Sequence, residues 1–267
     1  MKGFVISAQN TRNVNYLECA EALALNLKQV MPNCNVTLIS NDISMCNAFD
    51  NVVELPYGDL ATGSDWKLIN DWQVYEASPY EYTIKLEADM YVPNDISYFF
   101  DMLDTKDVLV CTNIRDYKGN ISSVRAYRQF IDDNKLPDVY NAITCFKKSE
   151  TAESFFKIVK DVFENWDKYR KTFICNNDEL ATTDWAYSIA CCILGIENTT
   201  IPNLISMVHM KQYINNTFTE DWTKEFIYEF GNTLKIQTFP QKYPVHYHIK
   251  QFGKIMKEHY GRIQTVL

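Results

Sequence analysis

The chain of 267 residues is 46% hydrophobic and 14% aromatic, so it can bury a sizeable core in one large domain or two small ones. Its net charge of −8 argues against a protein that coats nucleic acid or a membrane with its whole surface. Eight cysteines lie in apolar surroundings without a C-x-x-C pair, which predicts reduced thiols in a cytoplasmic protein. Neither a secretion signal nor an 18-residue apolar run is present, so we expect no membrane partner.

Strands and helices alternate through the first half of the chain. Apolar runs rich in β-branched residues predict strands over residues 3–8, 35–40, 51–56 and 82–92. Helical spacing predicts helices over 14–30 and 66–77, which end before Pro32 and Pro79. This order requires crossover connections, and it therefore predicts an α/β fold with a mostly parallel sheet between helices.

Two further helices are predicted from their first turns. A strand, "VYNAITCF" (139–146), precedes a helix for which Ser149 is the expected N-cap, with Glu150 and Glu153 at its positive end. The apolar run "WAYSIACCILG" (185–195) predicts another helix, with Thr183 or Asp184 at its amino end.

Two carboxylates stand at the end of the strand predicted over 82–92. Glu87 and Asp89 follow Ile84 and Leu86 with the period of a strand, so they project from one side of its carboxyl end. In open α/β sheets the ligand crevice lies outside the carboxyl ends of the strands. A hard cation is usually held by one or two carboxylates together with substrate phosphates. The pair therefore favours a site for a metal and a diphosphate, and the alternative is an ordinary polar strand end.

Three segments together resemble a known family. The start "FVISA", the acidic "KLEADMYVP" (85–93) and "VYNAITCFKKSE" (139–150) resemble the GT-A fold of nucleotide-sugar-dependent glycosyltransferases, in which a D-x-D-type motif ends a central strand. Residues 65–96 are also similar to sugar transferases of bacteriophages, some of which modify hydroxymethylated pyrimidines in phage DNA. The resemblance covers roughly residues 1–200, and the chain departs from the common motif in having Glu87 at the first acidic position.

The resemblance implies a domain organisation and a fold. A Rossmann-like GT-A domain with a mostly parallel mixed sheet would span 1–205, and a C-terminal extension over 206–267 would pack on the donor and acceptor side. It also implies a Mn²⁺ or Mg²⁺ ion and a nucleotide sugar, with a UDP-sugar favoured. Asp89 would bind the metal directly, and Glu87 would contact the metal shell or the ribose.

Further donor contacts are implied at the ends of the first strands, on the 66–77 helix beside Trp66, and at a small N-A step. These positions are Ser7, Ala8, Asn10, Thr11, Arg12, Asn41, Asp42, Lys67, Asn141 and Ala142. For each of them the alternative is an ordinary polar loop or a packed core residue.

The resemblance also implies an acidic residue that faces the acceptor hydroxyl. Asp184 is the candidate, with Asp178 and then Glu179 as the alternatives. An inverting transferase needs a general base within hydrogen-bond reach of that hydroxyl. A helix cap would account for Asp184 equally well.

Late in the chain, "PVHYHIKQFGK" (244–254) places His246 and His248 two residues apart. In several metal-dependent GT-A families a late histidine completes the metal shell and a following lysine meets the diphosphate. The resemblance therefore implies His246 or His248 as a ligand and Lys250 or Lys254 at the phosphates. His209 is the competing ligand.

The charge is distributed unevenly. Residues 235–262 hold six Lys or Arg against one acid, a net +5, which leaves −13 for the remainder. A second basic group follows the apolar run near 107–113, in a region that often shapes the acceptor side of GT-A enzymes: Arg115, Lys118, Arg125 and Arg128. Such charge suits leaving-group phosphates or a polyanionic acceptor.

Taken together, the resemblance and the basic C-terminal charge imply transfer of a sugar, glucose or a pentose such as arabinose, from a nucleotide diphosphate to a hydroxyl. The favoured acceptor is 5-hydroxymethylpyrimidine in duplex phage DNA. A saccharide or protein acceptor is the first alternative. The second is a non-catalytic module of the same fold that binds nucleotides or polyanions.

Overall fold

A computed structural model describes residues 1–42, 47–121, 128–175, 180–201, 204, 206–210, 228–229 and 234–264. In the first half, the elements are β1 (Lys2–Ser7), α1 (Tyr16–Val30), β2 (Val36–Ile39), β3 (Asn51–Val53), the 3₁₀ helix η1 (Lys67–Gln73), α2 (Val74–Ala77), β4 (Tyr82–Glu87), β5 (Met90–Tyr91), α3 (Tyr98–Met102), β6 (Val108–Cys111) and α4 (Gln129–Asp133). The second half contains β7 (Tyr140–Lys147), α5 (Glu150–Glu164), α6 (Trp166–Tyr169), α7 (Thr183–Leu194), α8 (Ile196–Thr199), β8 (Val208–Met210), β9 (Tyr228–Glu229), β10 (Lys235–Ile236), β11 (Phe239–Pro240), β12 (Val245–Tyr247) and α11 (Gln251–Gln264).

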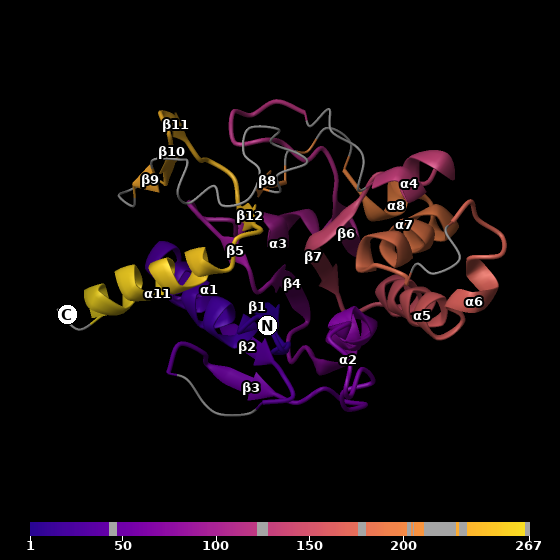
Figure 1. The fold of residues 1–267 in the computed structure, drawn as a ribbon, viewed down its shortest axis with the longest axis horizontal. Coiled ribbons are helices and arrows are strands. Elements are labelled where there is room, and N and C mark those ends of the chain that lie inside the picture. Colours follow the sequence, from indigo (N-terminus) through magenta and orange to yellow (C-terminus); the bar gives the residue numbers. More distant parts are fainter. Residues whose placement is uncertain are drawn as a thin grey trace.

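A six-stranded sheet with strand order β3-β2-β1-β4-β7-β6 lies at the centre of the molecule (Figure 1). The first four strands of this order run parallel, whereas β7 is antiparallel to both β4 and β6. Ser7 at the end of β1 lies opposite Ile39 of β2 on one side and Glu87 of β4 on the other. The prediction of a mostly parallel α/β sheet is confirmed, and its parallel strands end along one edge.

Helices cover both faces of this sheet because the strand side chains alternate. Phe4 and Ile6 of β1 point into a core shared with α1, α3 and α11. Val5 points into the opposite core, which α5 and α7 complete. All three side chains are essentially inaccessible to solvent, as expected for parallel strands that are covered on both faces.

Side-chain caps fix where the longer helices begin. The Ser149 hydroxyl accepts a hydrogen bond from the backbone N–H of Ala152 at 3.2 Å, so the predicted cap of α5 is confirmed. The cap of α7 is Thr182, whose hydroxyl accepts from the N–H of Trp185 at 3.2 Å. The prediction that Thr183 or Asp184 lies at the amino end of α7 is confirmed, because the helix begins at Thr183, whereas its N-cap is Thr182 and the Asp184 carboxylate has other partners.

The C-terminal segment (residues 234–264) returns to the central sheet. In the small sheet β5-β12-β8, β12 runs parallel to β8 and antiparallel to β5, which directly follows β4. Helix α11 packs on α1 (Figure 1), and Gly253 allows the close approach because a Cβ there would lie 2.9 Å from Cys19 Sγ. No helix in the described part of the chain is both long enough and apolar enough to cross a membrane.

Candidate metal centre and donor cavity

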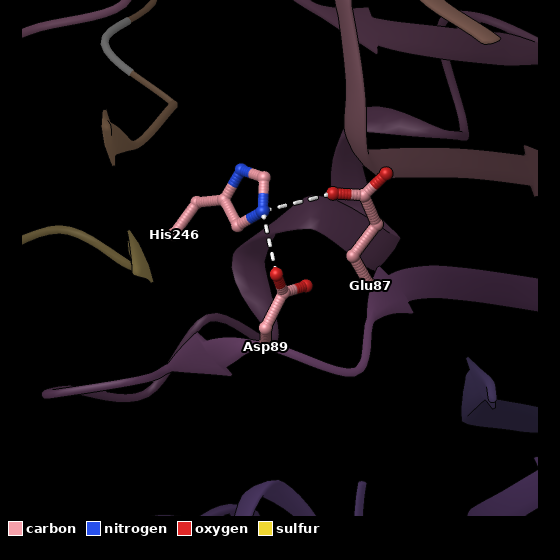
Figure 2. Close-up of side chains that lie close together, drawn as sticks. All are labelled: Glu87, Asp89 and His246. Carbon is pink, nitrogen blue, oxygen red and sulfur yellow. Dashed lines mark ion pairs between the residues drawn. The ribbon is translucent and has the colours of Figure 1, made fainter. Parts of the chain in front are cut away.

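Two carboxylates and one imidazole converge beyond the end of β4. His246 Nε2 lies 3.1 Å from Glu87 Oε2 and 3.2 Å from Asp89 Oδ2. Figure 2 shows the two carboxylates reaching the same ring nitrogen. Among the described residues, these three form the group of His, Cys, Asp and Glu side chains that is spaced to hold a metal ion, with one ligand atom from each within 4.8 Å of the others.

Backbone pairing brings these distant residues together. Glu87 is the last residue of β4, and Asp89 immediately precedes β5. His246 on β12 lies directly opposite Met90 of β5, and the N–H of Tyr247 donates to the Asp89 carbonyl at 3.0 Å. The register of one short antiparallel pair therefore decides that His246 joins the two carboxylates.

The predicted alternatives to His246 lie close to it. His209 on β8 pairs with His246 across the parallel ladder, and the two rings stack at 4.7 Å between centroids. His248 is exposed and lines the same cavity, but it is not part of the triad. The structure thus places His246 nearest to the carboxylates, with His209 behind its ring.

Lys250 also contacts the triad, because its ammonium forms an ion pair with the Asp89 carboxylate. Burial opposes ionisation of Asp89, but Lys250 and His246 outweigh it and hold the pKa of Asp89 well below its ordinary value. Burial raises the pKa of Glu87, although His246 and Lys85 oppose that shift. The pKa of His246 is raised, because the two carboxylates outweigh the effect of its burial.

The chemistry of this donor set fits a divalent cation. Carboxylates suit hard cations such as Mg²⁺ and Mn²⁺, and an imidazole is a common ligand of transition metals. Three protein ligands would leave positions in an octahedral shell for diphosphate oxygens. Glu87, Asp89 and His246 are thus the residues that could hold such an ion.

The triad lies on the wall of a cavity of about 500 Å³, within the range typical of small-molecule sites. The cavity extends from the ends of β1 and β4 to the start of β7 and of α7. Several predicted positions line it: Ser7, Ala8, Thr11, Trp66, Lys67, Glu87, Asp89, Asn141, Ala142, Asp184, His246, His248 and Lys250. These segments therefore share one site.

Other predicted positions do not line this cavity. The Asn10 side chain accepts from the N–H of Leu17 near the start of α1, and the N–H of Arg12 donates to the Asp65 carboxylate. The remaining three, Asn41, Asp42 and Lys254, are exposed. Asp178 and Glu179 lie outside the described residues.

Opposite the triad, the start of β7 meets the start of α7. One Asp184 oxygen accepts from Arg128 Nη1 at 2.7 Å, and the other accepts from the backbone N–H of Asn141 at 2.9 Å. The Asn141 carboxamide is buried, and its Nδ2 has no hydrogen-bond partner among the described residues. A buried amide donor beside a cavity is suited to a hydrogen-bond acceptor on a ligand.

A second buried ion pair lies beneath the cavity. Lys85 Nζ lies 2.7 Å from Asp71 Oδ1, and it donates to the Asn141 carbonyl at 3.3 Å. Asp71 also accepts from the Tyr187 hydroxyl of α7 at 2.6 Å. The Lys85 side chain is only 1% exposed, so this pair ties β4 to η1 and α7 within the core.

The sequence reading missed several cavity residues: Gln9, Tyr16, Asp71 and Lys85. One signal was available, because Lys85 precedes Glu87 by two residues and so shares its face of β4. A charged residue within an otherwise apolar strand indicates a buried partner. Arg128 was noted only as one of a basic group, and nothing in its local sequence points to Asp184.

Comparisons with known proteins agree with this architecture. No protein-family model and no curated protein sequence matches the chain. Among solved structures, the galactosyltransferase LgtC in complex with donor and acceptor sugar analogs aligns over 98% of this chain and 96% of its own, with a TM-score of 0.59 at 11% identity. Mouse xyloside xylosyltransferase 1 aligns over 93% and 98%, with a TM-score of 0.51 at 11% identity. The chain therefore has the GT-A fold that these glycosyltransferases share.

Proposed function

We propose that this protein is a metal-dependent glycosyltransferase that moves a sugar from a nucleotide diphosphate to a hydroxyl group. The observation that carries this proposal is the convergence of Glu87, Asp89 and His246 on the wall of the cavity, at the carboxyl end of β4. In a parallel α/β sheet this edge is where ligands bind.

Within this proposal the cavity residues divide into two groups. Glu87, Asp89 and His246 would hold a divalent cation, which stabilises charge on a leaving diphosphate when it is bound. Lys250 is close enough to reach the same phosphates. On the opposite wall, Asn141 would donate to the donor sugar and Asp184 would orient the attacking hydroxyl.

The donor we propose is a UDP-sugar, with Ser7, Ala8, Thr11 and Lys67 on the nucleotide side. The positions of Ser7, Ala8 and Thr11 support this, since they line the cavity near the end of β1, across β4 from Asn141 on β7, and Lys67 lines the same cavity from η1. A donor whose diphosphate lies at the triad would then extend its two halves toward opposite walls.

For the acceptor we propose a 5-hydroxymethylpyrimidine in duplex DNA. The similarity of residues 65–96 to phage sugar transferases supports this, as does the net +5 of residues 235–262. Lys242 and Lys254 in this region are exposed and could meet phosphates.

A second candidate acceptor is a neutral saccharide. The described cations on the cavity wall are matched by carboxylates: Lys67 with Asp59, Lys85 with Asp71, Arg128 with Asp138 and Asp184, and Lys250 with Asp89. Trp66 lines the cavity with 36% of its surface exposed, and an aromatic face suits a sugar ring.

The donor half of the proposal is tested by thermal unfolding with UDP-glucose, UDP-galactose and UDP-arabinose, each with and without Mn²⁺. A donor at 100 times its Kd stabilises the fold by about 2.7 kcal/mol, a shift of roughly 5 to 10 °C. We expect this shift only when Mn²⁺ is present, and we expect its loss in Asp89→Asn but not in the surface control Asp167→Asn. Equal thermal shifts in both variants would mean that the triad does not take part in donor binding.

The acceptor is tested by UDP release in the presence of each candidate. A duplex containing 5-hydroxymethylcytosine is compared with the unmodified duplex and with free glucose and galactose. Transfer to the modified duplex that declines steeply with salt supports the DNA proposal. Transfer to the free sugars alone supports the saccharide. Donor binding without any UDP release, to water or to these acceptors, favours the non-catalytic module.

A further inference from the structure

Arg128 lines the same cavity as the metal triad, and its charged side chain is only 1% exposed. Its Nε and Nη2 donate to Asp138 Oδ1 at 3.1 and 2.7 Å, and Nη2 also donates to the Val139 carbonyl at 2.6 Å. Its Nη1 donates to Asp184 at 2.7 Å, and its guanidinium lies 4.0 Å from the centre of the Tyr140 ring. One side chain thus joins the segment that precedes β7 to the first turn of α7.

Stability alone does not explain this arrangement. Removing a guanidinium from water is costly, and well-packed apolar residues often replace buried ion pairs without loss of stability. Asp138 is 43% exposed and does not need a buried partner, whereas Asp184 faces the cavity with 24% of its side chain exposed. The feature that Arg128 supplies and an apolar residue could not is a fixed direction for the Asp184 carboxylate.

The carboxylate of Asp184 is held at both oxygens. Arg128 binds Oδ2 and the backbone N–H of Asn141 binds Oδ1, so rotation of the carboxylate would break one bond or the other. Each carboxylate oxygen has a further lone pair, so the carboxylate can also accept a hydrogen bond from a hydroxyl in the cavity.

We propose that Arg128 is a positioning residue that fixes the Asp184 carboxylate for the hydroxyl that attacks the donor sugar. The inference rests on the proposed function and deepens it, because it assigns the orientation of the acceptor group to a guanidinium outside the metal centre. Arg128 also lines the cavity, and in this proposal it acts through Asp184. Charge-assisted hydrogen bonds from a planar fork hold a carboxylate more rigidly than an ammonium would.

The test is a double-mutant cycle on UDP release from UDP-glucose with Mn²⁺, or from whichever UDP-sugar gives the largest thermal shift. We expect Arg128→Met to lower kcat by about 10²-fold, the effect of misplacing a reacting group by roughly 1 Å, with the donor KM within about threefold. In Asp184→Asn, adding Arg128→Met should lower kcat no further. Arg128→Lys should recover part of the loss, because it restores the charge without the fork. Lys157→Met, which breaks an exposed pair with Glu153 on α5, should match the wild type.

Two results would overturn the inference. One is a double variant whose kcat falls by the product of the two single losses, which would mean that Arg128 and Asp184 act independently. The other is an Asp184→Asn variant with full activity. If Arg128→Met does not fold, Asp138→Asn replaces it, since it loosens the guanidinium from an exposed position. It should lower kcat in the wild-type background and leave Asp184→Asn unchanged. A wild-type protein that neither binds nor turns over any UDP-sugar would instead refute the proposed function.

Discussion

The two walls of the cavity hold their charged groups in different ways. On the metal side, Asp89 is shared between His246 and Lys250, and these partners come from a segment about 160 positions later in the chain. Beneath the cavity and on its opposite side, Lys85 and Arg128 are each 1% exposed, and each is bonded both to a carboxylate and to a backbone carbonyl.

This difference indicates that the two sides of the cavity have different roles. Lys250 is 23% exposed, so under the proposed function it would leave Asp89 and reach a phosphate when Asp89 accepts a cation. Arg128 and Lys85 cannot exchange partners in this way, because moving away from their carboxylates would leave buried charges unpaired. One wall is thus suited to exchange partners during binding, and the other to keep its geometry.

The largest loss of unfolding free energy should come from breaking the buried ion pair of Lys85 with Asp71. In Lys85→Met, Asp71 keeps the Tyr187 hydroxyl but loses its cation while only 11% exposed. Leaving one charge of a buried pair uncompensated costs about 3 to 5 kcal/mol of unfolding free energy. Urea unfolding measures this free energy, and the same measurement on Asp89→Asn gives the comparison with the metal side. There we expect a smaller loss, because Lys250 is 23% exposed and can turn to solvent while His246 keeps Glu87 as a partner. Equal losses in the two variants would contradict the distinction between the walls.

An effect of intermediate size is expected from Lys250→Met, on the affinities for Mn²⁺ and for UDP, which should change in opposite directions. Without its ammonium, Asp89 no longer has to exchange a partner, so Mn²⁺ alone should bind at least as tightly as in the wild type. UDP with Mn²⁺ should bind about 10- to 100-fold more weakly, the effect of losing a hydrogen bond to a charged group.

Titration calorimetry with Mn²⁺ alone and then with UDP measures both affinities for Lys250→Met. Lys254→Met is the matched control, since Lys254 is exposed and lies four residues later, in the first turn of α11. Weaker binding of Mn²⁺ alone in Lys250→Met would mean that the lysine supports the metal centre and does not compete with it. A loss of UDP affinity only in Lys254→Met would transfer the phosphate contact to that residue.

Much of the fold could be predicted because its signals are local. The apolar strands that became β1, β2 and β4 stand out from their loops, and Glu87 and Asp89 mark the end of one of them. Ser149 was predictable as a cap because capping depends on neighbours three residues away.

The rest depends on contacts that no local pattern encodes. His246 and His248 have the same alternation, and only the register of β12 opposite Met90 distinguishes them. Arg128 meets Asp184 across 56 residues of chain, through a bond that neither helical nor strand periodicity predicts. The antiparallel direction of β7 likewise followed from no motif.

The smallest effect should come from Lys257→Met. Lys257 Nζ lies 2.5 Å from Glu21 and joins α11 to α1, but the two side chains are 38% and 24% exposed. Such pairs contribute about 0.2 to 1 kcal/mol, whereas the inaccessible Phe252 and Met256 give α11 its apolar contact with the core. We therefore expect less than about 1 kcal/mol in urea unfolding and no change in Mn²⁺ affinity by calorimetry. If Mn²⁺ bound more than tenfold more weakly, the position of His246 would depend on this ion pair and not on apolar packing of α11.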